Sequence, residues 1–297
     1  MPGPFFSTKE LAEYLDIHEK QVYKLVQRGA LPGTRVTGKW LFPKDLIDRW
    51  IEATALETVG GALGADQRLV VVAEPDHLVD ALLATVGRGT EALIARATPA
   101  MDGGLHHLER GRAHLALVEF TRGACRWQWP PQLNRHLAGR PCRLVHVARR
   151  EIVVAWLGRR AVRSLADLEG RRVAVRAPGA ATRTLLDHRI LREGGDPSRL
   201  HLTPYGSHLD AALAVARGDA ELAVVPADEA HRVGLDGWSF ASLDLELVVL
   251  DEIARWRAVE HLIEVVTSPA WRSLAEQRPG VDASGTGAEQ TLNLMAS

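Results

Sequence analysis

Polar side chains between residues 20 and 39 have the types and spacing that contact nucleic acid. Most of them alternate with an apolar stripe at Val22, Leu25 and Val26, so they share the opposite face of one helix. The set consists of Lys20, Gln21, Tyr23, Lys24, Gln27, Arg28, Arg35 and Lys39. Gln and Arg can hydrogen-bond base edges in the major groove, and Lys and Arg can neutralise phosphates. A charged helix face that is only solvated is the alternative.

A second group of polar positions follows strand-like apolar segments further along the chain. The segments are "RLVVVA", "HLALV", "VAVRA" and "HLTPY". The positions that follow them are Glu74, Asp76, His77, Glu119, Ala180, Ala181, Thr182, Arg183, Ser207 and His208. Ligands of open α/β sheets bind at the carboxyl ends of strands, beside helix N-termini. We therefore expect these residues to line a ligand site.

The residue types at these predicted ligand-site positions indicate binding of a ligand. Backbone amides at residues 179–182 favour an anion, and Thr182 and Ser207 add hydroxyl groups. Arg183 can hold a carboxylate with two hydrogen bonds if it turns inward. Helix capping is the plain alternative for Thr182 and Ser207. Because no acid–base pair or partnered nucleophile is readable, we predict no catalytic residue.

Metal and cofactor sites are not predicted. His106 and His107 are adjacent, and neighbouring side chains on a helix diverge by about 100°. Cys125 and Cys142 are the only cysteines, which suits a reducing cytoplasm. The sequence shows neither a secretion signal nor an apolar run long enough for a membrane span. We expect a cytoplasmic protein with no membrane partner.

The elements that must position the first polar group form a compact module. Ser7 and Glu10 have the spacing of a capping box at the start of a helix. A second helix follows and ends at Gly29. The segment "TRVTGKWLF" predicts a hairpin, and Pro43 suits the first turn of a third helix. The predicted order is helix, turn, helix, wing, helix.

This module resembles the excisionase-type winged helix-turn-helix, a relative of the MerR DNA-binding domain, over residues 5–53. The resemblance implies that Gln21, Lys24 and Arg28 read bases and that Lys20 contacts phosphate. Arg35 and Lys39 on the wing would reach the backbone or minor groove. Residues 1–53 carry eight Lys and Arg against seven Asp and Glu. One copy would make few phosphate contacts, so we expect a homodimer on double-stranded DNA.

The rest of the chain follows a linker. Residues 54–67 are rich in Ala and Gly, and from residue 68 strands alternate with helices. This alternation predicts an α/β fold with mostly parallel sheets covered on both faces. The pattern restarts at "SLADLEGRRVAV" after the long run "CRLVHVARREIVVAW".

Residues 68–285 resemble the type II periplasmic-binding-protein fold of LysR-type effector domains and molybdate-binding-like domains. Ordered segments carry this resemblance, among them "PGAATRTLLD" and "YGSHLDAALAVARGDAELAVVPADEA". It implies two lobes joined by two crossing strands, here 142–156 and 243–252. The predicted organisation is a winged helix-turn-helix (1–53), a linker (54–67) and a ligand-sensing domain (68–297). Its first lobe would span about 68–148 and 251–297, and its second about 152–244.

The sequence indicates the chemical class of the ligand less directly than it indicates the fold. Relatives with this architecture are associated with molybdate or tungstate, which hydroxyls and amides hold. This sequence has Glu74 and Asp76 after its first strand and Ala180 and Ala181 where such relatives tend to carry hydroxyls. An added carboxylate at Glu74 would repel a dianion. A small organic ligand with a carboxylate and a donor group fits better than a simple oxyanion.

The reading that combines these features is a DNA-binding transcription regulator with a small-molecule or oxyanion effector. A lyase-type enzyme on a binding-protein fold is one alternative, with "AATRT" as its only motif. A ligand-independent architectural DNA binder is another. The absence of a readable acid–base pair favours a protein that is not an enzyme.

Overall fold

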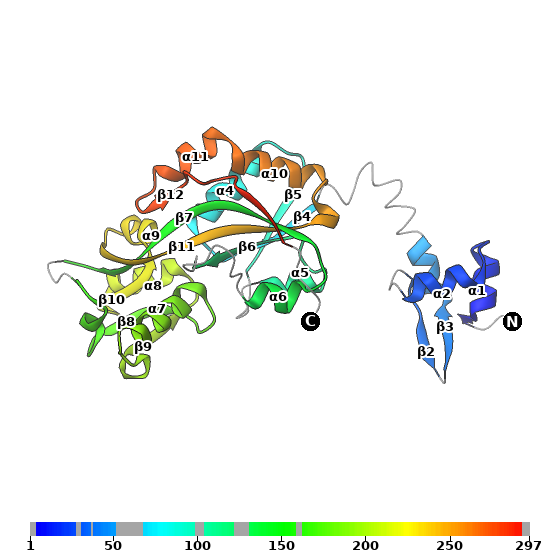
Figure 1. Ribbon diagram of the computed structural model, residues 1–297, viewed down its shortest axis with the longest axis horizontal. Coiled ribbons are helices and arrows are strands. Elements are labelled where there is room, and N and C mark those ends of the chain that lie inside the picture. Colours follow the sequence, from blue (N-terminus) through cyan, green and yellow to red (C-terminus); the bar gives the residue numbers. More distant parts are fainter. Residues whose placement is uncertain are drawn as a thin grey trace. The chain divides into compact units, whose positions relative to one another are not determined.

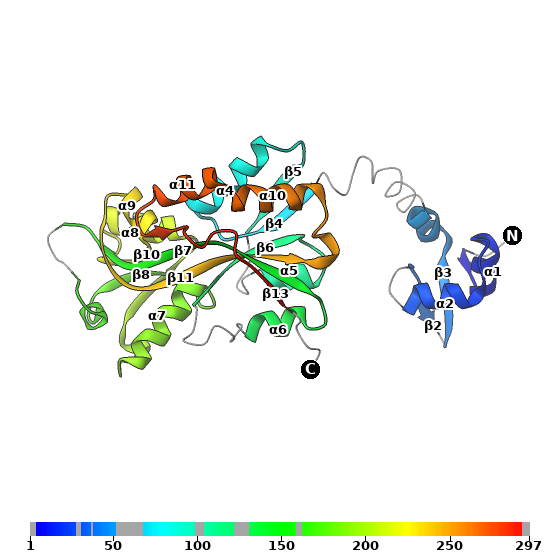
Figure 2. The ribbon, with the colours of Figure 1, turned by 45° about the horizontal axis from the view of Figure 1, so that its top comes forward.

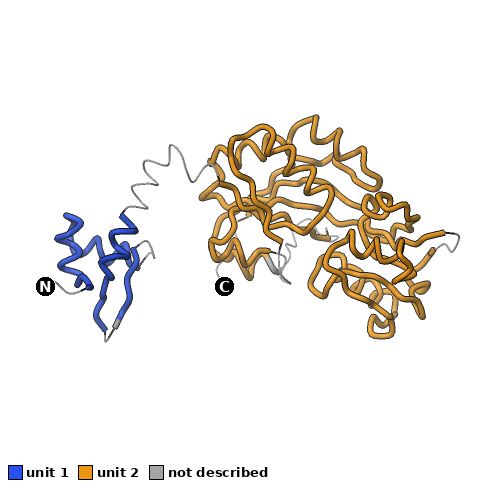
Figure 3. The backbone as a smooth tube through the Cα atoms, turned by 180° about the vertical axis from the view of Figure 1, so that it is seen from behind, with its two compact units in different colours: residues 1–67 blue, residues 68–297 orange. Residues whose placement is uncertain are grey.

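The computed structural model describes residues 4–27, 31–36, 38–51, 68–98, 104–121, 131–158 and 162–292. The chain divides into two compact units, Met1–Gln67 and Arg68–Ser297 (Figure 3). The predicted linker, Cys125 and Arg28 lie outside the described residues.

The first unit contains the predicted helices and wing. Its elements are β1 (Phe5–Phe6), α1 (Thr8–Tyr14), α2 (Glu19–Gln27), β2 (Thr34–Val36), β3 (Lys39–Pro43) and a helix over residues 44–51. The strands form a sheet in the order β1-β3-β2, and Leu11, Val22, Phe42 and Ile47 are fully buried in its core. The order helix, turn, helix, wing, helix is confirmed. Strand β1 was not predicted, because two residues are too few to show a pattern.

Local chemistry explains where these elements begin and turn. Ser7 N–H donates to Glu10 Oε2 at 2.7 Å, and Glu10 N–H donates to Ser7 Oγ at 3.3 Å, which confirms the capping box. Asp16, after α1, has a φ of 53°, a left-handed conformation that Asp tolerates better than most residues. Gly38 has a φ of 85° between β2 and β3.

A ten-stranded mixed sheet runs through the second unit (Figure 1). The main path has the order β5-β4-β6-β11-β7-β10-β8-β9, and β12 and β13 also pair with β7. The strands are β4 (Arg68–Val72), β5 (Leu93–Ala97), β6 (Leu115–Phe120), β7 (Cys142–Trp156), β8 (Arg172–Arg176), β9 (His201–Tyr205), β10 (Leu222–Pro226), β11 (Asp236–Leu250), β12 (Val281–Asp282) and β13 (Glu289–Leu292). Strands β7 and β11 pair antiparallel over nearly their whole length, from Asp236 opposite Trp156 to Leu250 opposite Cys142. They are the two strands that cross between the lobes.

Parallel strands flank this long pair on each side and define two lobes. The first lobe contains β4, β5 and β6, with β5 and β6 parallel to β4. Its helices are α4 (His77–Arg88), α5 (Leu105–Glu109), α6 (Pro131–Leu137), α10 (Arg257–Thr267) and α11 (Pro269–Glu276). Figures 1 and 2 show α4, α10 and α11 on one side of the sheet and α5 and α6 on the other.

The second lobe contains β8, β9 and β10, with β9 and β10 parallel to β8. Its helices are α7 (Ala181–Arg192), α8 (His208–Arg217) and α9 (Ala227–Arg232). Val173 and Val175 belong to the core under α7, whereas Ala174 belongs to the core under α8. Burial on both faces explains the continuous apolar sequences of these strands, and the predicted two-lobed α/β fold is confirmed.

The second crossing strand is longer than predicted. It begins at Asp236, whereas the sequence pattern predicted a strand from Leu243. Trp238 and Phe240 pack on the second-lobe core. The Gly and Ser residues around them interrupt the apolar pattern that would predict a strand. A register shift between Ser239 and Ala241 also interrupts the alternation.

Candidate functional site

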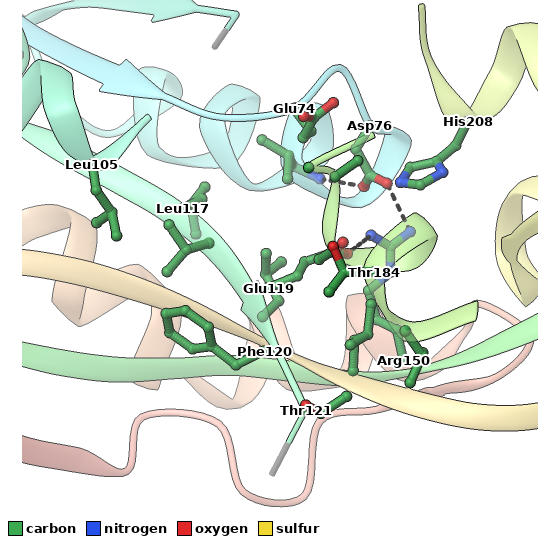
Figure 4. A pocket seen from close by; sticks show the side chains of 18 of the residues that line it. Glu74, Asp76, Leu105, Leu117, Glu119, Phe120, Thr121, Arg150, Thr184 and His208 are labelled. Atoms are coloured by element: carbon green, nitrogen blue, oxygen red, sulfur yellow. Dashed lines mark hydrogen bonds and ion pairs between the residues drawn. The ribbon is translucent and has the colours of Figure 1, made fainter. Parts of the chain in front are cut away.

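A cavity of about 690 Å³ lies between the two lobes of the second unit (Figure 4). Glu74, Asp76 and Glu119 reach it from the first lobe, and Ala180, Ala181 and His208 reach it from the second. Arg150, on the crossing strand β7, lines it between them. A molecule bound there would touch both lobes and the strands that join them.

Strand direction explains this convergence. Strands β4 and β6 are parallel, so the residues at their carboxyl ends, Glu74, Asp76 and Glu119, meet at one edge of the first-lobe sheet. In the second lobe, the carboxyl end of β10 leads directly into α9 and brings Asp228 to the same place. The expected ligand position at strand ends is therefore present in both lobes.

Arg150 is the centre of a buried ion cluster. Its Nη2 atom lies 2.7 Å from Asp76 Oδ2 and 3.0 Å from Asp228 Oδ1, and its Nη1 atom lies 3.1 Å from Glu119 Oε1. The Arg150 residue is only 1% exposed. One guanidinium thus contacts carboxyl groups from both lobes, where a charge without a partner would be costly.

The cluster shifts the pKa values of its members. Burial, opposed by Arg150 and reinforced by the carboxylates of Asp76, Glu74 and Asp228, raises the pKa of Glu119 to about 7. Burial would also raise the pKa of Asp76, but the charge of Arg150 outweighs it and holds that pKa below its usual value. At neutral pH Asp76 is ionised, whereas Glu119 is shared between its protonated and ionised forms.

His208 is a neutral group at this site. Burial lowers the pKa of its imidazole to about 3, so the ring carries no charge at neutral pH. The residue is 2% exposed and lines the cavity, and its Nδ1 atom has no hydrogen-bond partner in the described part of the chain. Figure 4 shows the ring beside Asp76. A buried polar atom without a partner in a cavity wall is a natural contact for a ligand.

Glu74 is paired across the lobes. Its Oε2 atom accepts a hydrogen bond from Arg176 Nη2, and Arg176 Nη1 donates to the Tyr205 carbonyl at 2.7 Å. The charge of Glu74 is therefore compensated, which weakens the expected repulsion between this residue and an anion.

The remaining wall of the cavity is largely apolar. Leu105, Leu117 and Phe120 of the first lobe and Leu243 and Leu245 of β11 line it. A fully hydrated oxyanion gains nothing from such a wall, whereas a hydrocarbon group does. This composition favours an organic ligand.

Four of the predicted ligand residues do not line the cavity. Thr182 is 1% exposed and faces the interior, and Arg183 pairs with Asp187 on its own helix at 2.9 Å. Ser207 caps α8 by accepting from Asp210 N–H at 3.0 Å. The His77 backbone N–H donates to Glu229 Oε1 at 2.9 Å. For Ser207 the capping alternative describes the observed contact.

The N-terminus of α7 does face the cavity, through Gly179, Ala180 and Ala181. Ala180 occupies the N-cap position and cannot make a side-chain cap bond. The first N–H groups of the helix are therefore available to an acceptor such as a carboxylate. Across the same cavity, the exposed Arg135 supplies a positive charge.

Sequence reasoning missed Arg150, Arg176 and Asp228. A signal for Arg150 exists in "ARREIV": along β7 the residues Arg149 and Glu151 are exposed while Arg150 between them is buried. Alternation thus puts a charged residue on the apolar face of a strand, which marks a buried ionic site.

The donor-rich face of the first unit is exposed as its pattern predicted. On α2, the side chains of Val22 and Val26 are buried, whereas the exposed residues are Lys20, Gln21, Tyr23, Lys24 and Gln27. On the wing, Arg35 and Lys39 are exposed as well, and Arg35 Nε donates to the Gly38 carbonyl at 3.2 Å. This surface stays a predicted DNA contact.

Two further searches concern metals and membranes. Within the described ranges, no group of three or more His, Cys, Asp or Glu side chains could hold a metal ion. None of the helices in the same part of the chain is both long and apolar enough to cross a bilayer.

Comparison with known families agrees with this architecture. Residues 87–267 match the PBP superfamily domain, and residues 5–55 match a helix-turn-helix domain. The first match covers more than half of the chain, so the chain belongs to the PBP superfamily. A helix-turn-helix joined to such a domain is the organisation of a DNA-binding transcription regulator. No curated protein sequence matches the chain.

Solved structures with the same fold include regulators and binding proteins. A full-length BenM variant has a TM-score of 0.52 at 12% identity and covers 91% of this chain and 92% of its own. The regulatory domain of MetR, a LysR family regulator from N. meningitidis, has a TM-score of 0.52 at 12% identity, covering 72% and 97%. A periplasmic transporter has a TM-score of 0.54 at 13% identity, covering 75% and 91%. At these identities the likeness concerns the fold.

Proposed function

We propose that this regulator changes its DNA binding when a small carboxylate-bearing organic molecule enters the cavity between its lobes. The observation that carries the proposal is the cavity itself, since both lobes and the crossing strand β7 line it. A ligand alters DNA binding only if it favours one conformation of the protein over another. A molecule that touches both lobes favours one spacing between them.

The walls of the cavity support the chemical class. The carboxylate would accept a hydrogen bond from the free backbone amide of Ala181 at the start of α7, with Arg135 as a second positive group. The hydrocarbon part would pack on Leu117 and Phe120.

The predicted DNA partner, dimer and location belong to the same proposal. The first unit has few positive charges for a DNA-binding domain, so a homodimer would double its phosphate contacts. Dimeric helix-turn-helix proteins bind two half-sites, and ligand-dependent movement of the lobes would change the distance between the two modules. The cytoplasmic location predicted from the sequence agrees with a DNA partner.

The test combines binding with a matched pair of variants. Thermal unfolding of the full-length protein is measured against carboxylic acids, amino acids and molybdate. DNA selected by the protein from a random pool is then titrated with and without each stabilising compound. Ala181→Asp places a carboxylate at the start of α7, where it suits the helix but repels an anionic ligand. Ala181→Asn has nearly the same shape without the charge.

We expect a carboxylate to stabilise the wild type and the Asn variant, to change their DNA affinity, and to lose at least tenfold in affinity for the Asp variant. Stabilisation by molybdate alone would contradict the organic ligand. Stabilisation without any change in DNA affinity would contradict regulation by this cavity. Recovery of unchanged compound after incubation separates a regulator from the lyase alternative.

A further inference from the structure

The inner end of the cavity contains more carboxyl groups than guanidinium groups. Glu74, Asp76 and Glu119 line it, and Asp228 pairs with Arg150 at 3.0 Å. Among the described residues, Arg150 and Arg176 are the two guanidinium groups that contact these carboxyl groups. With Glu119 ionised, four negative charges therefore face two positive ones.

Both guanidinium groups already have partners. Arg150 contacts Asp76, Glu119 and Asp228, and Arg176 contacts Glu74. Glu119 uses Oε1 and Glu74 uses Oε2 in these pairs, and the second oxygen of each has no hydrogen-bond partner among the described residues. These two oxygens can accept hydrogen bonds from a ligand.

His208 provides an independent sign that a ligand makes a polar contact here. The residue is 2% exposed and lines the cavity, and no described residue hydrogen-bonds its Nδ1 atom. A neutral imidazole does not repel a cation, and in the tautomer that carries its proton on Nε2 the Nδ1 atom accepts a hydrogen bond. In Figure 4 the ring lies on the same side of the cavity as Glu74 and Asp76.

We propose that this inner end binds a positively charged ammonium group of the effector, held by Glu74, Glu119 and His208. The inference rests on the proposed function, because it assigns the second polar end of the molecule bound in that cavity. An ammonium has three N–H donors and no acceptor, which matches three acceptors near excess negative charge. With a carboxylate at α7 and an apolar wall between, the ligand class is an amino acid or related amine with a hydrocarbon side chain.

The direction of proton exchange on binding distinguishes a bound ammonium group from a bound anion. Burial raises the pKa of Glu119 to about 7, and the charged groups that face it are Arg150, Asp76, Glu74 and Asp228. A bound cation favours the ionised carboxylate, so binding at pH 7 releases up to about half a proton. An anion placed beside Glu119 would instead cause proton uptake.

The experiment uses two series of three matched probes on the full-length protein. One series is L-leucine, isoamylamine and 4-methylpentanoate, and the other is L-phenylalanine, phenethylamine and 3-phenylpropanoate. Titration calorimetry at pH 7 in phosphate and in Tris gives the affinity and the number of protons exchanged. Glu119→Gln is measured beside Glu221→Gln, since Glu221 is a surface residue paired with Arg172.

We expect at least one amine-bearing probe to bind ten times more tightly than its deaminated acid, with net proton release. Glu119→Gln should abolish the release and weaken binding, whereas Glu221→Gln should change neither. Proton release by the wild type tests the inference even if the Glu119→Gln variant unfolds. Equal or tighter binding of the acid, or proton uptake, would overturn it. Failure of every amine-bearing probe would also overturn it. An acid that still binds would then leave the proposed function standing, and a blank with all probes would remove both.

Discussion

Arg150 Nη2 lies 3.0 Å from Asp228 Oδ1, and this ion pair joins the crossing strand β7 to the first turn of α9 in the second lobe. The same nitrogen lies 2.7 Å from Asp76 Oδ2 in the first lobe. The two carboxylates therefore share one guanidinium atom, and each holds its own lobe to the central strand. Any movement of one lobe against the other must change the geometry at this nitrogen.

Replacing Arg150 should destabilise the second unit strongly. Arg150→Met keeps much of the side-chain volume but leaves Asp76, Glu119 and Asp228 buried without their cation. Loss of one partner from a buried ion cluster costs about 3–5 kcal/mol in the free energy of unfolding. Urea denaturation at pH 8 measures this loss. At pH 6 the loss should shrink, because protonation neutralises part of the stranded negative charge.

The matched control is Arg172→Ala. The Arg172 side chain is 59% exposed and pairs with Glu221 at 4.0 Å, so its removal should cost less than about 1 kcal/mol. Similar costs for Arg150→Met and Arg172→Ala would contradict a structural role for the buried cluster.

The raised pKa of Glu119 predicts a specific pH dependence of stability. The carboxyl titrates near 4.5 when unfolded and at about 7 when folded, so the folded protein binds the proton more tightly. The resulting stability is fully present below pH 4.5 and is lost as the pH rises through about 7. Glu119→Gln cannot titrate. The free energy of unfolding of the wild type relative to this variant should fall by about 2–3 kcal/mol between pH 5 and pH 8.

Paired denaturation curves of the two proteins at four pH values check this dependence. Taking the difference cancels other titrating groups, such as His208. Glu221→Gln serves as the control and should show the same pH profile as the wild type. A difference that stays constant from pH 5 to pH 8 would mean that Glu119 titrates as an ordinary exposed carboxyl.

Sequence patterns predicted the order of elements well, because burial on both faces leaves a strong apolar signal. Strand β4, with Leu69 and Val71 fully buried, reads directly from "RLVVV". The first half of β11 could not be predicted, because its Gly and Ser residues interrupt the strand pattern. This part of the strand is determined by its pairing with β7. Long-range pairing of this kind has no local signature.

The candidate site was predicted in its place but only in part in its residues. Strand ends indicated Asp76 and Glu119, and both line the cavity, while their contact with a ligand stays a prediction. Arg150 is central to the cluster partly because it pairs with Asp228, which lies 78 residues away in sequence. One sequence without its contacts cannot show that these two charges meet, so the cluster emerges only from the three-dimensional arrangement.

The exposed face of α2 predicts how DNA affinity responds to substitution. Lys24→Ala removes an exposed positive charge without touching the buried Val22 and Val26, so folding should be unaffected. If Lys24 contacts phosphate or a base, affinity for selected DNA falls about fivefold to a hundredfold, which corresponds to about 1–3 kcal/mol.

Lys9→Ala removes an equally exposed charge from α1 and should leave affinity within twofold. Fluorescence anisotropy at several salt concentrations measures both variants. A phosphate contact lowers the salt slope by about one, whereas a base contact changes the preferred sequence. Equal effects of the two substitutions would mean that α2 is a solvated face and that DNA, if bound, meets another surface.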